Sequence, residues 1–238
     1  MVGIKSDAGI VRDLNEDYAA YIEKKDYKLY IVADGMGGHN AGEVASKLAV
    51  ESILEYVEEH FDIENKNLFK EAIKYANKSI YDMSYNNSEY KGMGTTITGC
   101  LILGDKIQIA NVGDSCTFGI KGKEIVKITK DHSWVQELID LGAITEEEGR
   151  VHPKKNVITR ALGTTLSLEV DIFEVGKNIY DMFLLCTDGL INEVMKEEFI
   201  EIINSNNDLN NACSEMIELA KSRGGKDNIT VLLFGGEV

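Results

Sequence analysis

Six acidic residues adjoin apolar segments of the kind that form β-strands. They are Asp34, Asp114, Asp188 and Asp227, together with the neighbouring pair Glu16 and Asp17. If the ends of these strands meet at one edge of a sheet, the carboxylates lie close together and repel unless a cation neutralises them. Ligands that are all oxygen suit Mg²⁺ or Mn²⁺, and no His or Cys pair has the spacing of a zinc site. The pattern therefore indicates a divalent-cation site.

A simpler interpretation stays open for each aspartate taken singly. Asp-Gly, as in Asp34-Gly35 and Asp188-Gly189, is also a common turn pair. The metal interpretation is favoured because several of these residues each adjoin a strongly apolar segment.

The elements that would position these side chains follow from the spacing of apolar residues. Strands are expected at 2–5, 18–22, 28–33, 95–103, 106–112, 116–120, 124–128, 168–175, 181–186 and 228–234. Helices are expected after Asn40, which can cap the first of them, and then at 68–83, 133–142, 196–204 and 209–221. The segment 145–156 is polar and holds the only proline, so we expect it to be irregular.

The order of these elements predicts the fold class. Hairpin strands and paired helices do not alternate as they do around a parallel sheet. Several strands, such as the one at 95–103, are apolar on both faces, which is typical of stacked sheets covered by helices. We predict an α+β fold with two stacked, mostly antiparallel β-sheets flanked by helix pairs. This four-layer αββα sandwich would be a single domain over residues 1–238.

Composition excludes several classes of function. The chain has 238 residues and a net charge of −15, which disfavours nucleic acid and anionic membranes as partners. No apolar run reaches the roughly 18 residues of a membrane span, and the N-terminus has no apolar signal core. The four cysteines form no C-x-x-C pair, and three lie in apolar runs. We therefore expect a reduced, cytoplasmic protein.

The motifs taken together resemble a known family. The ordered set is RDLNEDY, VADGMGGHNAGEVAS, GTT, NVGDS, KDHS, NVITRALG, LLCTDGL and GGKDNITVLL, and it spans Arg12 to Leu233. This set resembles the metal-dependent protein phosphatases of the 2C type (PPM family), in the compact bacterial form that opposes Ser/Thr kinases. The resemblance implies hydrolysis of phosphoserine and phosphothreonine in proteins by a metal-activated water. It implies two or three Mn²⁺ or Mg²⁺ ions as cofactor, of which two are core ions and the third, where present, is weaker.

The resemblance also implies roles for single residues. Asp34 would bridge the two core ions and the Gly35 carbonyl would bind one of them. Asp188 and Asp227 would hold the other ion, with Glu16 and Asp17 acting directly or through water. Asp114, together with Asp188, matches the residues that hold the third, weaker metal ion in the family.

One further match concerns the substrate. Arg12 matches the arginine that grips the substrate phosphate, and a planar guanidinium can bind two phosphoryl oxygens.

Two positions depart from the family pattern. Met36 stands where many members have a histidine proposed as general acid, and His39 nearby is the candidate for that role here. Cys116 replaces an arginine after NVGDS, which puts the packing around Asp114 and the third ion in doubt. A flap-like excursion at about 143–160 would influence substrate choice.

Partners and competing interpretations follow from the same residues. We expect phosphorylated proteins and a cognate Ser/Thr kinase as partners, and a monomer. GMGGHNAG resembles a dinucleotide-binding loop but lacks its third glycine, and no P-loop or Cys-nucleophile loop occurs. A pseudophosphatase that binds phosphoproteins without turnover, and an enzyme for small phosphate esters, are the alternatives that stay open.

Overall fold

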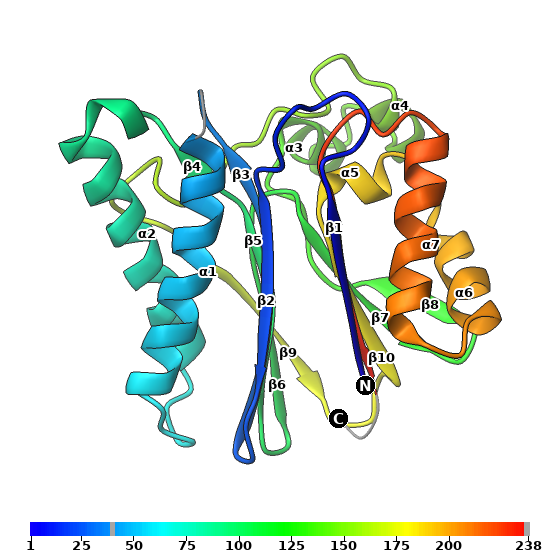
Figure 1. Ribbon diagram of the computed structural model, residues 1–238, viewed down its shortest axis with the longest axis horizontal. Coiled ribbons are helices and arrows are strands. Elements are labelled where there is room, and N and C mark those ends of the chain that lie inside the picture. The colour runs from blue at the N-terminus through cyan, green and yellow to red at the C-terminus, as the bar shows by residue number, and fades with distance from the viewer. Residues whose placement is uncertain (39–40, 236–238) are drawn as a thin grey trace.

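The computed structural model describes residues 1–38 and 41–235 and contains two antiparallel β-sheets (Figure 1). The first sheet has the strand order β1-β11-β10-β7-β8, with β1 at Val2–Asp7, β11 at Ile229–Gly235, β10 at Met182–Cys186, β7 at Cys116–Lys121 and β8 at Glu124–Lys127. The second has the order β2-β3-β5-β6-β9, with β2 at Asp17–Glu23, β3 at Tyr27–Met36, β5 at Ile97–Leu103, β6 at Lys106–Val112 and β9 at Asp171–Gly176. A short strand β4, Gly94–Thr95, pairs with the end of β3.

Helix pairs cover the outer faces of the two sheets. Helices α1 (Ala41–Glu59) and α2 (Leu68–Asn86) lie against the second sheet, and α6 (Lys196–Ser205) and α7 (Leu209–Ser222) lie on the opposite side of the molecule (Figure 1). Shorter helices are α3 (Trp134–Asp140), α4 (Glu146–Arg150), α5 (Asp188–Ile191) and the 3₁₀ helix η1 (Ser88–Tyr90). The prediction of an αββα sandwich is confirmed.

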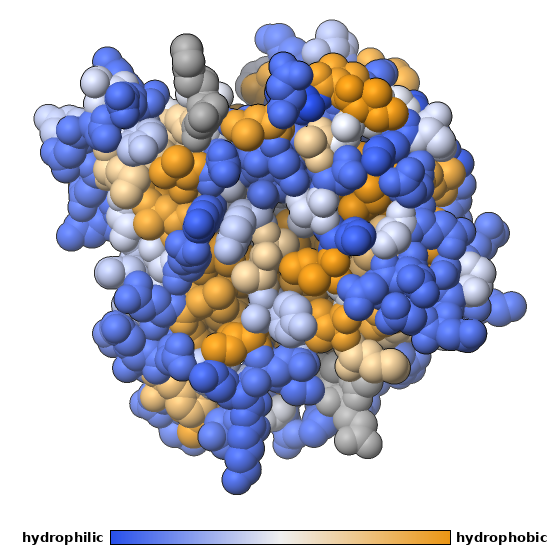
Figure 2. Space-filling view, in the orientation of Figure 1, coloured by the Kyte–Doolittle hydropathy of each residue, from blue (hydrophilic) through white to orange (hydrophobic). Residues whose placement is uncertain are grey.

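Apolar residues from both sheets fill the space between the sheets. Tyr30 of β3 stacks on Phe234 of β11 with ring centroids 3.6 Å apart, and Phe183 of β10 stacks on Phe234 at 5.4 Å. Strand β5 is buried along its whole length, as expected for a strand that is apolar on both faces. The surface face in Figure 2 is mostly hydrophilic, with hydrophobic side chains visible between the helical layers.

Three local predictions differ from the structure. Strand β3 does not end at Ala33, because its pairing with β4 carries it through Asp34 to Met36. The segment 145–156 is not wholly irregular, because helix α4 begins in it. Thr145 Oγ1 accepts a hydrogen bond from the Glu148 amide, and Glu148 Oε2 accepts one from the Thr145 amide, which together form a capping box. Helix α5 was not predicted, because it is a single turn.

Two further observations concern the helices. Asn40, the predicted cap of α1, lies outside the described residues. Among the helices that the structure describes, none is both long and apolar enough to cross a membrane.

Candidate metal centre

A pocket of about 320 Å³ opens at the edge where the two sheets meet. It is lined by seven of the residues that the sequence singled out, namely Arg12, Glu16, Asp34, Gly35, Asp114, Asp188 and Asp227. Residues that were not predicted also line it, namely Gly37, Thr96, Asn156, Ile158 and Asn228, and so does Met36. Asp17 lies behind the lining residues rather than among them, and His39 lies outside the described residues.

Asp34 projects from β3 with its backbone held on both sides. The Asp34 amide donates to Thr96 Oγ1 at 3.0 Å, and the Thr96 amide donates to the Asp34 carbonyl at 2.8 Å. These bonds occupy the main chain and leave the carboxylate to the pocket. Burial, followed by the charges of Asp17 and Asp188, raises the pKa of Asp34 well above its ordinary value.

Asp17 is fully enclosed beside Asp34. The two residues are directly opposite in the β2–β3 ladder. Asp17 Oδ2 accepts from Thr187 Oγ1 at 2.9 Å, whereas Oδ1 is buried and has no hydrogen-bond partner among the described residues. Burial, partly offset by hydrogen bonds from Thr230 and Thr187, raises the pKa of Asp17 to about 7.

Asp114 and Asp188 approach the same pocket from two other strands. Asp114 follows β6 in a tight turn, and Asp188 begins α5 directly after β10. Asn192 Nδ2 donates to Asp188 Oδ2 at 3.0 Å. Burial and the neighbouring charge of Asp188 raise the pKa of Asp114 to about 8, and burial with the charge of Asp227 raises the pKa of Asp188 to about 6.

Gly35 and Gly42 allow an unusually close approach between β3 and the start of α1. A Cβ on Gly35 would lie 2.1 Å from the Gly42 carbonyl oxygen and 2.5 Å from that of Glu16. A Cβ on Gly42 would lie 2.4 Å from Glu16 Oε1. Only glycine fits at these positions, so Glu16 is packed tightly beside the Asp34-Gly35 segment. Burial raises the pKa of Glu16 above its ordinary value.

Arg12 forms an ion pair with one of the predicted ligands. Its Nη2 donates to Asp227 Oδ2 at 2.9 Å, and about half of the Arg12 side chain is exposed. The charge of Asp227 raises the pKa of Arg12 further, so the guanidinium is permanently charged. A guanidinium carries five N–H donors, so others remain for a phosphoryl group while this bond is in place.

Asn228 ties the loop that carries Arg12 and Glu16 to the start of β11. Its Nδ2 donates to the carbonyls of Ala8 at 3.0 Å and Leu14 at 2.8 Å, and its Oδ1 accepts from the Glu16 amide at 2.8 Å. The sequence shows only an Asn after Asp227. Asn228 lies within the motif GGKDNITVLL, but the motif does not show its role, because its partners are backbone groups more than 200 positions away.

Two observations indicate that this pocket fits divalent cations. Carboxylates that raise one another's pKa values in a shared pocket are stabilised by a positive charge. The buried Asp17 Oδ1 has a lone pair without a hydrogen-bond donor among the described residues, and this atom can bind a metal or its water. As the side chains lie in this structure, no three or more His, Cys, Asp or Glu residues among those described are grouped closely enough to hold a metal ion.

The raised pKa values predict an unusual pH dependence of stability in protein stripped of metal. The carboxyl groups of Asp17, Asp114 and Asp188 have folded-state pKa values of about 7, 8 and 6, all above the ordinary 3.8. The folded state therefore holds protons that the unfolded state has released, and the free energy of unfolding falls as pH rises from about 4 to 8. We expect a loss of several kcal/mol, and at least about 2 kcal/mol, between pH 5 and pH 8 in urea denaturation. A free energy that stays level or increases over this range contradicts the repulsion described above.

Manganese is expected to reverse this trend. At a concentration about 100 times its Kd, a ligand that binds only the folded state adds about 2.7 kcal/mol of stability. Because protons compete for the carboxylates, the stabilisation by Mn²⁺ should be larger at pH 8 than at pH 5.

The two departures from the family pattern lie at or near this pocket. Met36 lines the pocket, and a thioether cannot donate a proton, so Met36 cannot act as a general acid. Cys116 is buried at the start of β7, with its Sγ 3.7 Å from Cys186 Sγ on the neighbouring strand β10. A compact thiol pair thus fills the space beside the strand ends that carry Asp114 and Asp188.

Comparison with known proteins adds independent findings. A family model described as Protein phosphatase 2C matches residues 10–228. The serine/threonine phosphatase stp of Listeria monocytogenes serotype 4b (strain F2365) is 40% identical over 234 residues, covering 96% of this chain and 93% of the relative.

Solved structures of serine/threonine phosphatases are also similar to this chain. The crystal structure of the Mycobacterium tuberculosis serine/threonine phosphatase PstP/Ppp has a TM-score of 0.89 and 33% identity, covering 100% of this chain and 99% of that one. A structure of the catalytic domain of the serine threonine protein phosphatase PstP, in complex with two manganese ions, has a TM-score of 0.83 and 32% identity. The match covers 98% of this chain and 96% of that one.

Proposed function

This chain belongs to the protein phosphatase 2C family, and from that premise we propose that the carboxylate pocket is its active site. The protein is a metal-dependent serine/threonine phosphatase that uses Mn²⁺ or Mg²⁺ to hydrolyse phosphoserine and phosphothreonine in proteins. The observation that carries the assignment of the site is the convergence of Asp34, Asp188 and Asp227 in one pocket.

The metal ligands are assigned from this pocket. Asp34, the Gly35 carbonyl, Asp188 and Asp227 would hold the core ions, and Glu16 and Asp17 would support them directly or through water. When bound, a pair of divalent ions lowers the pKa of a water molecule and neutralises charge at the phosphoryl group. The protein's own contribution is to position two of these residues: Thr96 Oγ1 accepts from the Asp34 amide, and Thr187 Oγ1 donates to the Asp17 carboxylate.

Arg12 and the flap-like segment position the substrate. Arg12 lies at the exposed rim of the pocket and offers its free N–H groups to two phosphoryl oxygens. Asn156 and Ile158, which belong to the excursion at about 143–160, form part of the pocket wall. From this position they would contact the substrate around the phosphorylated side chain. Because the protein itself is strongly acidic, local positive charge is needed here to hold a phosphate dianion.

Finer features are proposed on the same basis. Asp114 and Asp188, whose pKa values are raised by burial and by neighbouring carboxylates, hold a third and weaker ion. Residues 1–238 form one catalytic domain that acts as a cytoplasmic monomer. A cognate Ser/Thr kinase and its substrates are the partners. His39 remains the candidate for a general acid.

The test of this function is release of phosphate from a phosphothreonine peptide. We expect turnover with millimolar Mn²⁺, complete loss with a chelator, and recovery when the metal is restored. Binding of the phosphopeptide without turnover would favour a pseudophosphatase. A much higher kcat/KM for a small aryl phosphate than for the peptide would favour the small-ester enzyme.

Substitution of Arg12 tests its role in binding. Arg12→Ala should raise KM for the phosphopeptide about tenfold with a smaller change in kcat, because a charge-assisted hydrogen bond to bound phosphate is worth about 1.5–3 kcal/mol. Arg12→Lys keeps the charge but not the planar fork, so its KM should be intermediate. Steady-state kinetics checks this, and an unchanged KM in Arg12→Ala refutes the role.

A further inference from the structure

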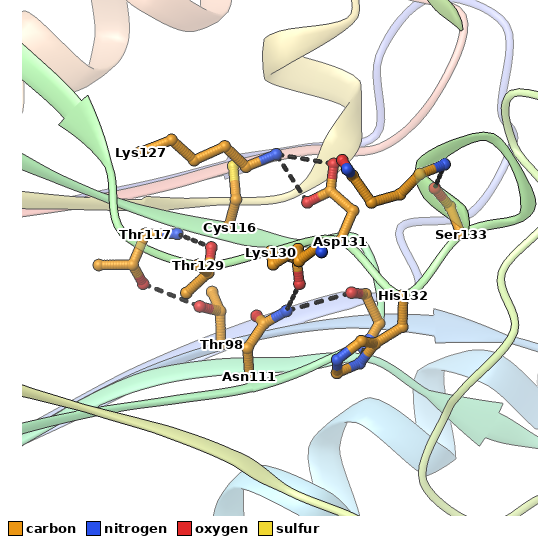
Figure 3. A network of polar contacts seen from close by, with 12 residues as sticks. Thr98, Asn111, Cys116, Thr117, Lys127, Thr129, Lys130, Asp131, His132 and Ser133 are labelled. Carbon is orange, nitrogen blue, oxygen red and sulfur yellow. Dashed lines mark hydrogen bonds and ion pairs between the residues drawn. The ribbon is translucent and has the colours of Figure 1, made fainter. Parts of the chain in front are cut away.

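The turn that carries Asp114 is held from behind by His132. His132 Nδ1 accepts from the Gly113 amide at 3.1 Å, and the His132 amide donates to the Gly113 carbonyl at 2.9 Å. Asn111 Nδ2 donates to that same carbonyl at 3.1 Å and to the carbonyl of Lys130 at 3.1 Å. Figure 3 shows Asn111, Lys130 and His132 close together in this network. Both backbone polar groups of Gly113 are thus bound inside the protein.

The orientation of the imidazole is fixed by its opposite nitrogen. Because Nδ1 accepts the hydrogen bond from Gly113, the neutral ring carries its own proton on Nε2. Asp171 Oδ2 lies 3.2 Å from Nε2 and accepts a hydrogen bond from it. Arg160 Nη1 lies 3.1 Å from the same nitrogen, but it donates to Asp171 Oδ1 at 2.8 Å. Asp171, which Arg160 holds in place, therefore selects the tautomer that the Gly113 amide requires.

The turn itself has little freedom to adjust. Gly113 has φ +106°, a conformation that side chains rarely adopt, and a Cβ there would lie 2.6 Å from Thr96 Cβ. Thr96 is the residue whose hydroxyl receives the Asp34 amide. A change in the Gly113 turn is thus transmitted both to Asp114 and to the residue that supports Asp34.

We propose that His132 is a positioning residue of the active site, whose neutral imidazole holds the Gly113 turn so that Asp114 enters the pocket. This inference rests on the proposed function of that pocket. His132 also connects the turn to the flap-like wall, because the Thr159 amide donates to the His132 carbonyl at 2.8 Å and the adjoining Ile158 lines the pocket.

Protonation of His132 breaks this arrangement. A proton on Nδ1 would face the Gly113 amide, and two donors cannot share a hydrogen bond. The charged groups around the ring are Asp171 on β9, Arg160 in the flap-like segment, and Asp131 in the loop after β8, which is itself held by Lys127 at 2.6 Å. Burial lowers the pKa of His132 below 6.5, so the ring is neutral at pH 7.

Two variants separate the hydrogen bond from the packing. His132→Asn places Oδ1 near the position of Nδ1, so it keeps an acceptor that does not titrate in this range. His132→Leu keeps the volume and removes the acceptor. We expect kcat of His132→Leu to fall about tenfold or more, with KM for the phosphopeptide within about twofold of wild type. His132→Asn should recover most of kcat. The control His60→Asn, on the exposed residue after α1, should match wild type.

The pH profile gives a readout that general destabilisation does not move. On the acidic side of the profile, the plot of log kcat against pH should have a slope one unit smaller in His132→Asn than in wild type. The variant lacks the imidazole that takes up a proton there, and only the carboxylates still titrate. The proposal is overturned if His132→Leu keeps wild-type kcat, or if His132→Asn shows the wild-type acid limb. Should His132→Leu fail to fold, the comparison of wild type with His132→Asn still decides.

Metal-free protein gives a second, independent readout. Imidazole ¹⁵N NMR should show Nδ1 unprotonated and Nε2 protonated at pH 7.5, and exchange of the Gly113 amide should quicken as His132 titrates. An Nδ1-protonated ring overturns the proposal, whether or not the enzyme turns over. Loss of all activity in wild type with this tautomer in place would instead count against the proposed function alone.

Discussion

Asp34→Asn is expected to abolish turnover while making the metal-free protein more stable. The carboxylate of Asp34 projects into the pocket beside Asp17 and Asp188, and their charges raise its pKa. If Asp34 is a metal ligand as proposed, its removal takes away several kcal/mol of transition-state stabilisation, which corresponds to a fall in kcat of at least about 10³-fold. Removing one of several repelling charges should raise the free energy of unfolding at pH 8 without metal by about 1–2 kcal/mol.

Both halves of this result are measurable on the same sample. Phosphate release from a phosphothreonine peptide reports the activity, and urea denaturation with and without Mn²⁺ reports the stability. Asp26→Asn, in the exposed turn between β2 and β3, is the matched control and should change neither quantity. If Asp34→Asn is less stable than wild type in the absence of metal, repulsion between the carboxylates does not govern stability at this site.

Asn228→Ala is expected to damage both the fold and the site, although Asn228 is neither charged nor assigned to the metal. The substitution removes the bonds to the carbonyls of Ala8 and Leu14 and to the Glu16 amide, which belong to half-buried or exposed residues. An intramolecular hydrogen bond contributes about 0.5–1.5 kcal/mol, so we expect a loss of about 2–3 kcal/mol in the free energy of unfolding. The loop that carries Arg12 and Glu16 is released at the same time.

Kinetics separates these two effects of Asn228. At a temperature where the variant remains folded, kcat/KM should still fall at least about tenfold, because small displacements of reacting groups are costly. Asn204→Ala, on an exposed position of α6, is the control for loss of an Asn side chain and should leave both quantities unchanged. Wild-type kcat/KM in folded Asn228→Ala would show that the loop keeps its position without these bonds.

The sequence predicted the fold and the convergence of the aspartates for the same physical reason. Apolar periodicity determines which segments pair as strands, and strand ends then bring Asp34, Asp114 and Asp188 to one edge although they are far apart in the chain. The pattern could not show that Asp17 lies behind Asp34 rather than in the pocket lining, because that depends on strand register.

Residues that act through backbone hydrogen bonds could not be identified in this way. Asn228 and Thr96 lie in the motifs GGKDNITVLL and GTT, but their roles depend on backbone partners that are distant in the sequence, and the motifs do not reveal these partners. Helix α4 is different, because Thr145 with Glu148 is a capping-box signal that was present and was outweighed by the polarity of the segment. The extension of β3 past Ala33 depended on a pairing with β4, and a strand of two residues is too short to be predicted from its pattern.

The pairing of β1 with β11 has a consequence for synthesis of the enzyme. Arg12 and Asp227, which meet across the pocket, are 215 positions apart, and the strands beside them join the first and last segments of the described chain. Contacts between such distant segments form slowly, after more local ones. While a ribosome is still translating the message, the α1–α2 half can begin to collapse, but the pocket has no Asp227. If Asp227 is a metal ligand as proposed, a nascent chain that has not yet reached β11 lacks it, and we expect such an incomplete translation product to have no phosphatase activity.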